Sequence, residues 1–398
     1  MRKTKLENWI QEVEGLPVLD REALDALQLK KLNETLKRLH DMGKAYPESV
    51  KSLKELENLP FTTAKMLAEN PGSFLLTSQS EVSRVISGAT SGTTGPAKRV
   101  FYTDRDTEHT VGFFAAGISE MLSAGEKCLI AFPFSGPFGL GDLIAKAVER
   151  LGAIPVKAGF GQSWAELCQT VKETQPETYI GFPVTLLGLC RVYGNSFPIR
   201  RALVSGDACP EGVMQALEKA LGSRLYPHYG SRECGLGGAV TCPAFDGMHL
   251  RENHIIPEII DGKGNVLPEG EFGELVITTI GLEAMPLIRY RTGDYTRIMP
   301  ACPCGGLTRR IDRVIRKEGK ISMEQLDSIV FSFDGVVDFR AEFKDKLRIE
   351  LCCVAKINEA ELRERIEKLY PCVKIELVCG NFDYSARPMY LGKRFVEG

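Results

Sequence analysis

The sequence predicts an α/β protein with a large N-terminal domain over residues 1–311 and a small α+β domain over residues 312–398. Three observations support this fold class. The chain has 398 residues, which is more than one compact core of ordinary size. From about residue 84, short apolar runs alternate with helical stretches, as in parallel or mixed sheets with crossover helices. Beyond Arg313, a shorter alternation of helix and strand signals favours a separate C-terminal unit.

The elements of the large domain follow from the spacing of its apolar residues. Residues 1 to about 70 have a helical pattern, because Leu29, Leu32, Leu36 and Leu39 recur at helical spacing between charged residues. The segments that follow alternate in type. Strands are expected at 84–86, 128–132, 154–156, 178–180 and 201–204, and helices at 142–151 and 165–173.

Two further regions complete the predicted fold. Between about 255 and 300, the β-branched run 274–279 lies among turn-forming glycines, so a small antiparallel β unit is expected there. The C-terminal domain should contain helices at 323–331 and 359–369 and strands at 336–343, 347–354 and 373–378.

Composition excludes several classes of function. Apolar residues make up 43% of the chain and charged residues 26%, the profile of a soluble globular protein. The formal net charge of −2 gives no electrostatic reason to expect nucleic acid or an anionic membrane as a partner. No apolar stretch reaches the ~20 residues that span a bilayer, and the polar start of the chain argues against secretion. Most of the 12 cysteines lie in apolar segments, as expected of buried thiols in a reducing cytoplasm, and a homodimer is compatible with the sequence.

The segment Thr90–Lys98 has the composition of a phosphate-binding loop. Glycines let backbone N–H groups turn toward an anion, hydroxyls add donors without bulk, and Lys98 adds positive charge. The residues expected to hold phosphate are Ser91, Gly92, Thr93, Thr94 and Gly95. The segment does not match the P-loop pattern of Gly, four residues and then Gly-Lys-Ser/Thr. A flexible surface turn is the alternative interpretation.

This loop and four later segments, taken in order, resemble the motifs of the adenylate-forming superfamily. The superfamily includes acyl- and aryl-CoA ligases, luciferases and the adenylation domains of peptide synthetases. The similarity covers about residues 84 to 398. The later segments are Ser205-Gly206-Asp207-Ala208, Tyr229-Gly230-Ser231-Arg232-Glu233, Tyr290-Arg291-Thr292-Gly293-Asp294 and Gly392-Lys393.

The resemblance implies a role for each segment, and each role is chemically reasonable by itself. Tyr229 would stack on adenine, next to Gly230 and Ser231, and Ser205, Gly206 and Asp207 would line the adenine pocket. Asp294 would accept hydrogen bonds from the ribose hydroxyls. Glu233 would hold Mg²⁺ at the phosphates of ATP, and Lys393 would reach the reacting carboxylate and the α-phosphate. Taken singly, Asp294 has the alternative of a turn residue and Lys393 that of a solvated lysine; the ordered set makes those alternatives weaker.

A second constellation consists of Cys242, His249, Cys302 and Cys304. Two pairs of soft ligands, each closing a short loop, suit a tetrahedral structural Zn²⁺. Two unrelated pairs, or a simple turn at Cys302-Pro303-Cys304, are the alternatives. The phenylacetate-CoA ligase branch of the superfamily is similar in both segments, and some of its members carry zinc there. The remaining histidines are expected at the surface or in the core, with His228 beside the nucleotide pocket.

Near the domain boundary the sequence departs from the superfamily pattern. Asp312 is the expected hinge residue, and Arg310 the expected contact to ribose or phosphate. Arg313 stands where a second acidic residue is usual, and Glu318 replaces a basic residue. A carboxylate at Glu318 would repel the phosphates of coenzyme A, so the acyl acceptor stays open at this stage.

The acid-binding pocket is expected in two apolar, aromatic segments. Its predicted residues are Phe134, Ser135, Phe138, Gly139 and Phe182. An aromatic carboxylate is the first expectation, although aromatic core packing gives the same composition.

The function predicted from these observations is ATP-dependent activation of a small-molecule carboxylate, followed by transfer to coenzyme A. One alternative keeps the adenylation but transfers the acyl group to an amine, a protein cysteine or a carrier arm. A third, from another class, is a nucleotide-binding sensor without turnover; Lys393 argues against it, because a sensor needs no such lysine.

Overall fold

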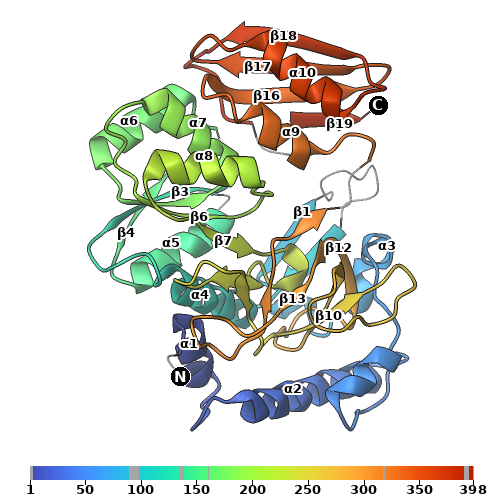
Figure 1. Cartoon of the computed structure of the whole chain (residues 1–398). Coiled ribbons are helices and arrows are strands. Elements are labelled where there is room, and N and C mark those ends of the chain that lie inside the picture. The colour runs from blue at the N-terminus through green and yellow to red at the C-terminus, as the bar shows by residue number, and fades with distance from the viewer. Residues whose placement is uncertain are drawn as a thin grey trace. The chain divides into compact units, whose positions relative to one another are not determined.

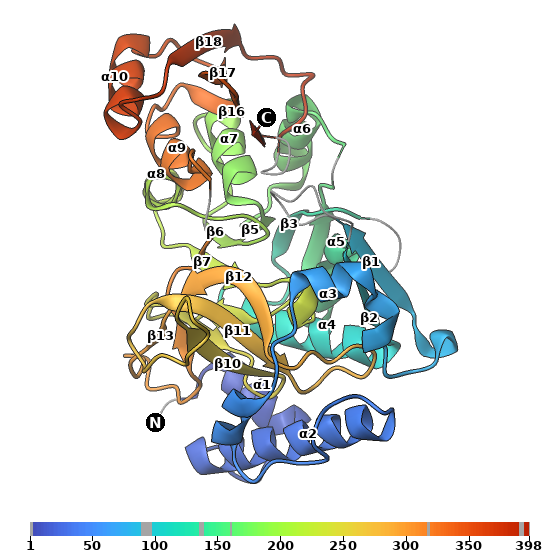
Figure 2. The same cartoon turned by 90° about the vertical axis from the view of Figure 1, so that its right-hand side faces the viewer.

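The structure is a computed structural model that describes residues 3–88, 98–134, 139–159, 161–316, 319–389 and 394–397 (Figures 1 and 2). It forms two compact units, each built from two stretches of the chain. Unit 1 comprises residues 1–120 and 228–317, and unit 2 comprises residues 121–227 and 318–398. The C-terminal stretch is thus grouped with the central part of the chain. The expected domain boundary at 311/312 stays a prediction.

Unit 1 begins with helices whose ends are fixed by side-chain caps. In α1 (Lys5–Val13), the Thr4 side chain accepts from the Glu7 amide while Glu7 bonds back to the Thr4 amide. In α2 (Arg21–Asp41), Asp20 is the cap, and the leucine face expected from the sequence is buried at Leu32, Leu36 and Leu39. Shorter helices follow: η1 (Leu53–Asn58), α3 (Ala64–Glu69), η2 (Pro71–Phe74) and η3 (Gln79–Glu81).

Antiparallel pairing dominates the rest of unit 1. Strands β1 (Arg84–Gly88) and β2 (Lys98–Tyr102) form a two-stranded sheet, followed by α4 (Asp104–Ile118). Strands β10 (Ile255–Ile260), β11 (Gly273–Thr279), β12 (Tyr290–Thr296) and β15 (Ile315–Arg316) form a four-stranded sheet in that order. This sheet confirms the antiparallel β unit expected between residues 255 and 300.

Another run of antiparallel strands in unit 1 carries several of the expected site residues. Its elements are β7 (Tyr226–Tyr229), η4 (Arg232–Cys234), β8 (Ala239–Thr241), β9 (Met248–Leu250), β13 (Ile298–Met299) and β14 (Arg310–Ile311). The strands pair in the order β7, β8, β9, β14, β13. Strand β7 crosses the division between the units, since its first two residues pair with β6 of unit 2 and its last two with β8.

Unit 2 begins with the alternation that the sequence predicts. Strands β3 (Lys127–Ala131), β4 (Ile154–Lys157), β5 (Thr178–Gly181) and β6 (Arg201–Val204) are all parallel, in the order β4-β3-β5-β6. The crossover helices are α5 (Leu140–Arg150), α6 (Trp164–Thr174) and α7 (Pro183–Tyr193), and α8 (Glu211–Leu221) follows β6. The predicted strands and helices of this region are confirmed.

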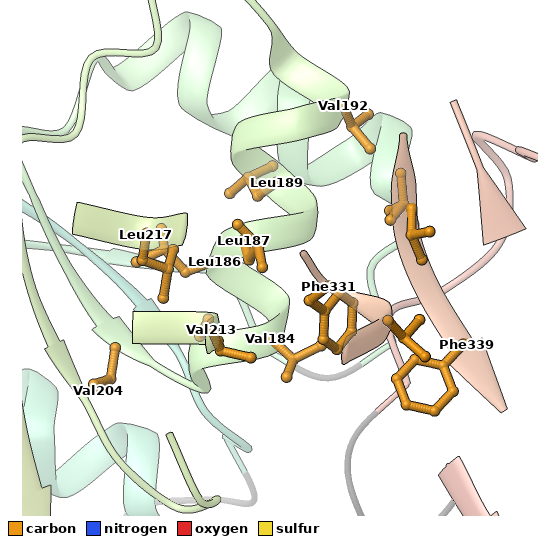
Figure 3. Packing of buried hydrophobic residues seen from close by; sticks show 14 of the residues in the cluster. Val184, Leu186, Leu187, Leu189, Val192, Val204, Val213, Leu217, Phe331 and Phe339 are labelled. Atoms are coloured by element: carbon orange, nitrogen blue, oxygen red, sulfur yellow. The ribbon is translucent and has the colours of Figure 1, made fainter. Parts of the chain in front are cut away.

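The C-terminal stretch of unit 2 is an α+β arrangement, as predicted. Its elements are α9 (Met323–Val330), β16 (Val336–Phe343), β17 (Leu347–Cys353), α10 (Glu359–Leu369), β18 (Ile375–Asn381) and β19 (Phe395–Glu397). The sheet order is β18-β17-β16-β19, with β16 and β17 antiparallel and the outer pairs parallel. Figure 3 shows Phe331 and Phe339 packing near Val184 of α7, within a single buried cluster shared by both stretches of the unit.

No helix in the described parts of the chain is both long enough and apolar enough to cross a membrane.

Candidate active site

A buried, hydrogen-bonded group of three side chains lies in unit 1. Lys98 begins β2, Glu233 lies in the turn η4, and Tyr290 begins β12. The Lys98 ammonium pairs with Glu233 Oε1 and donates to the Tyr290 hydroxyl at 2.8 Å, and that hydroxyl lies 3.1 Å from Glu233 Oε1. Lys98 and Glu233 are each only 5% exposed. Segments far apart in sequence therefore bring one cation, one anion and one phenol to a single point.

The charge of Glu233 is maintained by its partners. Burial by itself would raise the pKa of this carboxyl, but the adjacent Lys98 ammonium and its hydrogen bond hold the pKa below the ordinary value. The turn that positions Glu233 depends on Gly230, whose Cβ, if present, would clash with the backbone carbonyl oxygen of Leu236. Ser231 supports the same turn, because its backbone N–H donates to Cys234 Sγ at 3.1 Å.

A second group in unit 1 surrounds Asp294. The Tyr229 hydroxyl donates to Asp294 Oδ2 at 2.9 Å, and Arg316 Nε donates to Oδ1 at 2.9 Å. The Asp294 amide donates to the Thr292 hydroxyl at 3.0 Å, and Gly293 between them has a φ of +74°, which glycine adopts readily. Because β12 carries both Tyr290 and Asp294, one strand joins this group to the Lys98–Glu233 pair.

Arg310 bonds to the segments near Asp246 and Pro300. Its Nε donates to the Pro300 carbonyl at 2.9 Å, and its guanidinium pairs with the Asp246 carboxylate at 2.9 Å. Arg310 also lies opposite His249 in the pairing of β14 with β9. The arginine that the structure brings to Asp294 is Arg316, to which the sequence had assigned no role. The expected contact of Arg310 with the nucleotide stays a prediction.

The expected adenine-pocket segment lies in unit 2, directly after β6. Gly206 has a φ of +80°, and an added Cβ would lie 2.8 Å from the Phe182 ring and 2.9 Å from the Phe132 ring. Those two rings meet edge to face at 5.0 Å. Asp207 accepts from the Ala208 amide at 2.8 Å and lies 3.9 Å from Arg394. Ser205 is buried at the end of the strand, where its amide donates to the Gly181 carbonyl at 3.0 Å.

The predicted acid-pocket residues are described in part. Phe134 packs against glycines: an added Cβ at Gly141 would lie 2.9 Å from its ring and one at Gly159 would lie 2.8 Å away. Gly139 is buried and caps α5. Several expected site residues lie outside the described residues: Ser91, Gly92, Thr93, Thr94, Gly95, Ser135, Phe138 and Lys393.

Asp312, the expected hinge residue, lies just after β14. Its Oδ2 accepts from Arg297 Nε at 2.8 Å, so this carboxylate is paired with a side chain of unit 1.

The cysteine and histidine constellation is assembled in unit 1. The ligand atoms of Cys242, His249, Cys302 and Cys304 all lie within 4.8 Å of one another. Cys242 Sγ is 3.7 Å from Cys302 Sγ, and Cys304 Sγ is 3.4 Å from His249 Nε2. Backbone N–H groups of Ala244 and Gly306 point at Cys242 Sγ and Cys304 Sγ, at 3.4 and 3.3 Å. No disulfide is present among the described cysteines.

Besides Arg316, two residues near these groups were not expected from the sequence. Tyr290 begins the segment Tyr290-Arg291-Thr292-Gly293-Asp294, of which the motif resemblance gives a role to Asp294 alone. Thr308 accepts from or donates to His249 Nδ1 at 2.9 Å through its hydroxyl, and no short-range pattern links the two residues. The position of Tyr290 at the start of the motif was the one available signal.

Comparison with known proteins gives matches over most of the chain. Residues 84–284 match the family described as AMP-binding enzyme. Phenylacetate-coenzyme A ligase of Pseudomonas putida is 27% identical, over 95% of this chain and 88% of the relative. The enzyme of the same name from Escherichia coli K12 is 31% identical, over 73% of this chain and 70% of the relative.

Solved structures give the same fold. A 2-hydroxyisobutyryl-CoA ligase in its postadenylation state has a TM-score of 0.79 at 18% identity, covering 96% of this chain and 90% of that one. The same ligase in its thioesterification state has a TM-score of 0.69 at 20% identity, covering 95% and 90%.

Proposed function

Because the chain belongs to the AMP-binding enzyme family, we propose that it activates a small-molecule carboxylate with ATP and transfers the acyl group to coenzyme A. In the first step a carboxylate oxygen bonds to the α-phosphorus of ATP and pyrophosphate leaves, which gives an acyl-adenylate. In the second step the thiol sulfur of coenzyme A bonds to the acyl carbon, the thiol proton is released and AMP leaves. The observation that carries this proposal is that β12 joins two groups of hydrogen-bonded side chains. Its Tyr290 contacts Lys98 and Glu233, and its Asp294 accepts from Tyr229.

We assign the ribose to Asp294. Its two carboxylate oxygens accept from Tyr229 and Arg316, and a carboxylate has further lone pairs for vicinal hydroxyls. Tyr229 would then offer its ring to adenine while its hydroxyl fixes the orientation of Asp294. Arg316 is better supported than Arg310 as the basic neighbour of this site, because Arg310 donates to the Pro300 carbonyl, close to Cys302 in sequence. Ser205, Gly206 and Asp207 are assigned to the adenine pocket.

We assign the phosphates of ATP to Lys98, Lys393 and the loop residues Ser91–Gly95. The Glu233 carboxylate offers a hard oxygen ligand to Mg²⁺, an ion that would neutralise charge on the phosphates when bound. Adenylation needs alignment and charge neutralisation more than covalent chemistry by the protein. Lys98 and Glu233, paired and buried, are ready-made partners for the two kinds of charge in Mg-ATP. Lys393 would reach the reacting carboxylate.

An aromatic carboxylate is the proposed acid substrate. Phe132 and Phe182 meet edge to face beside Gly206, and Phe134 packs over two glycines. Flat rings bordered by glycine suit a flat acyl group. Phenylacetate, the acid in the names of the relatives, is the first compound to test. Ser135, Phe138 and Gly139 are assigned to the same pocket.

We propose that Cys242, His249, Cys302 and Cys304 hold a structural Zn²⁺. Three sulfurs and one imidazole nitrogen within 4.8 Å of one another fit a closed tetrahedral site, in which a fourth protein ligand excludes water. The Thr308 hydroxyl beside His249 Nδ1 supports binding of the metal through Nε2. Such a site would stabilise the fold and take no part in the reaction.

Asp312 is proposed as the hinge between domains at 1–311 and 312–398. Rotation about it would exchange an adenylation arrangement for a thioester-forming one. A cytoplasmic location and a homodimer stay expectations.

The experiment is carboxylate-dependent exchange of pyrophosphate into ATP, run with a panel of aromatic and aliphatic acids and followed by an assay for CoA thioesters. Lys393→Ala is expected to reduce exchange about 100-fold or more while ATP binding is retained, because the lysine acts on charge that develops in the reaction. Lys374→Ala, at an exposed lysine of the same stretch, serves as the matched control and should leave exchange unchanged.

Each outcome of this experiment decides something. Absence of exchange with every acid would exclude adenylation and favour a nucleotide sensor. Exchange without any thioester would exclude coenzyme A as the acceptor and favour an amine, a protein cysteine or a carrier arm. Loss of ATP binding in Lys393→Ala would contradict the role given to that lysine.

A further inference from the structure

The carboxylate of Glu7 in α1 is buried against the loop that follows Cys304. Glu7 is 1% exposed. Its Oε1 accepts from the backbone N–H groups of Leu307 at 2.5 Å and Thr308 at 2.9 Å, and its Oε2 accepts from the Thr4 amide at 3.0 Å. A carboxylate buried this deeply is tolerated only where donors satisfy it. The docked position of α1 therefore depends on the conformation of the loop at 305–308.

Thr308 connects this carboxylate to the histidine of the proposed metal site. Its hydroxyl lies 3.3 Å from Glu7 Oε1 and 2.9 Å from His249 Nδ1. A hydroxyl that donates to the carboxylate can accept from an imidazole N–H, and the Thr308 backbone carbonyl oxygen, 3.2 Å from the same nitrogen, can only accept. This arrangement puts the proton of His249 on Nδ1 and leaves Nε2, which faces Cys304 Sγ at 3.4 Å, free to bind a metal.

Gly306 is the point where the helix, the loop and the histidine meet. An added Cβ would lie 2.9 Å from Glu7 Oε1, 3.0 Å from Thr4 Cγ2 and 3.1 Å from His249 Cε1. Only a residue without a side chain lets all three approach so closely. The helix start and the metal ligand are thus packed against the same backbone atoms.

We propose that Glu7, acting through Thr308, orients His249 for metal binding, so that docking of α1 and binding of Zn²⁺ strengthen each other. The inference rests on the proposed zinc site. The coupling is reciprocal: the factor by which docked α1 increases the affinity for zinc equals the factor by which zinc favours docking of α1. Outer partners of metal-bound histidines typically change metal affinity ~10–100-fold when removed.

Helix α1 also packs against α4, through contacts that are separate from the proposed metal site. Trp9, on the same helix, lies 6.2 Å from the Phe113 ring of α4, and an added Cβ at Gly112 of α4 would lie 2.8 Å from its indole nitrogen. These contacts with α4 do not involve the loop at 305–308. Loss of zinc should therefore loosen the Glu7 end of the helix first.

The test measures zinc affinity of the full-length chain by competition with a chromophoric chelator. Glu7→Gln is expected to weaken zinc binding about tenfold or more, and Thr308→Val should act in the same direction because it removes the hydroxyl at nearly constant volume. Thr308→Ser keeps the hydroxyl and should bind zinc with nearly the affinity of the unmodified chain. Glu12→Gln, at an exposed glutamate of α1, is the matched control and should bind zinc normally.

Hydrogen exchange supplies a second readout. Removal of zinc should increase amide exchange in residues 5–13, whereas α10 in unit 2 should be unaffected. Unchanged affinity in Glu7→Gln and Thr308→Val would overturn the coupling and leave the zinc site standing. Absence of zinc binding by the unmodified chain would overturn the site itself, and the coupling with it.

Discussion

At the scale of single residues, the candidate site consists of charges that are buried together. Lys98 and Glu233 are nearly inaccessible to water, and the Tyr290 hydroxyl contacts both. Leaving one such charge without its partner would cost several kcal/mol. Substrate phosphates and a metal ion are partners of the right sign for each member of this pair.

Arg251 is a buried charge of a different kind. It is 0% exposed, and its three guanidinium nitrogens have no hydrogen-bond partner among the described residues. The rings of Trp9 and Phe113 flank it at 5.5 and 5.1 Å. Burial lowers the pKa of this guanidinium to about 10. Cation–π contacts return only ~2 kcal/mol, which is less than the cost of burying a charge.

Replacement of Arg251 by Met is therefore expected to stabilise the protein, by about 1–4 kcal/mol in the free energy of unfolding. Methionine keeps the length of the side chain and packs well between aromatic rings. Urea denaturation gives the measurement. Arg251→Lys keeps the charge and should give no such gain. Destabilisation by Met would mean that the guanidinium has a compensating partner in solution, such as an anion or bound water.

At the scale of elements, the C-terminal strand is anchored by a buried, bidentate ion pair. Arg394 precedes β19 and donates two hydrogen bonds, at 2.6 and 2.9 Å, to the carboxylate of Asp327 on α9. The guanidinium lies between Phe331 and Phe339, at 5.7 and 5.2 Å from their rings. Bidentate geometry fixes direction as well as distance, so α9 and β19 have one favoured arrangement.

Asp327→Asn is expected to destabilise unit 2 by about 3 kcal/mol or more, because the buried Arg394 charge loses its bidentate partner and keeps the Asp207 carboxylate only at 3.9 Å. A lowered midpoint in urea, followed by circular dichroism, is the readout. Glu361→Gln removes the partner of Arg365 in an exposed pair on α10, and its effect should stay within about 0.5 kcal/mol. Equal effects of the two substitutions would contradict the importance given to burial.

At the scale of the whole molecule, buried histidines make stability depend on pH. Burial lowers the pKa of His228 to about 4 and that of His254 well below its ordinary value. An unfolded chain has histidine pKa values of about 6.5, so between pH 4 and that value the unfolded state binds more protons than the folded state. Their contribution to stability is therefore complete above about pH 6.5 and is lost as pH falls toward 4.

The urea midpoint should accordingly be lower at pH 5 than at pH 7.5. His228→Gln is expected to reduce the difference between the two pH values, since it removes one of the groups that take up a proton on unfolding. His40→Gln, at an exposed histidine, should leave the difference unchanged. A difference that is the same in all three proteins would show that other groups, such as the cysteine and histidine cluster, govern the acid response.

The sequence by itself determined most of the local structure and the nature of the chemistry. Periodicity predicted the parallel strands β3 to β6 and both C-terminal helices, because a strand or helix that faces a core must repeat its apolar residues with its own period. The ordered motifs indicated ATP chemistry, since phosphate, ribose and Mg²⁺ each require a particular type of side chain. The four cysteine and histidine residues were predicted as one cluster, which the structure assembles.

Only the tertiary structure decided which side chains meet across long distances in sequence. It joined Tyr290 to Lys98, Arg316 rather than Arg310 to Asp294, and Glu7 through Thr308 to His249. It also grouped the C-terminal stretch with residues 121–227. Such contacts depend on strand register and helix docking, where a shift of one residue turns a side chain to the opposite face of a sheet. Local pattern determines which face of an element is apolar, whereas the partner of a polar side chain is set by the packing of the whole unit.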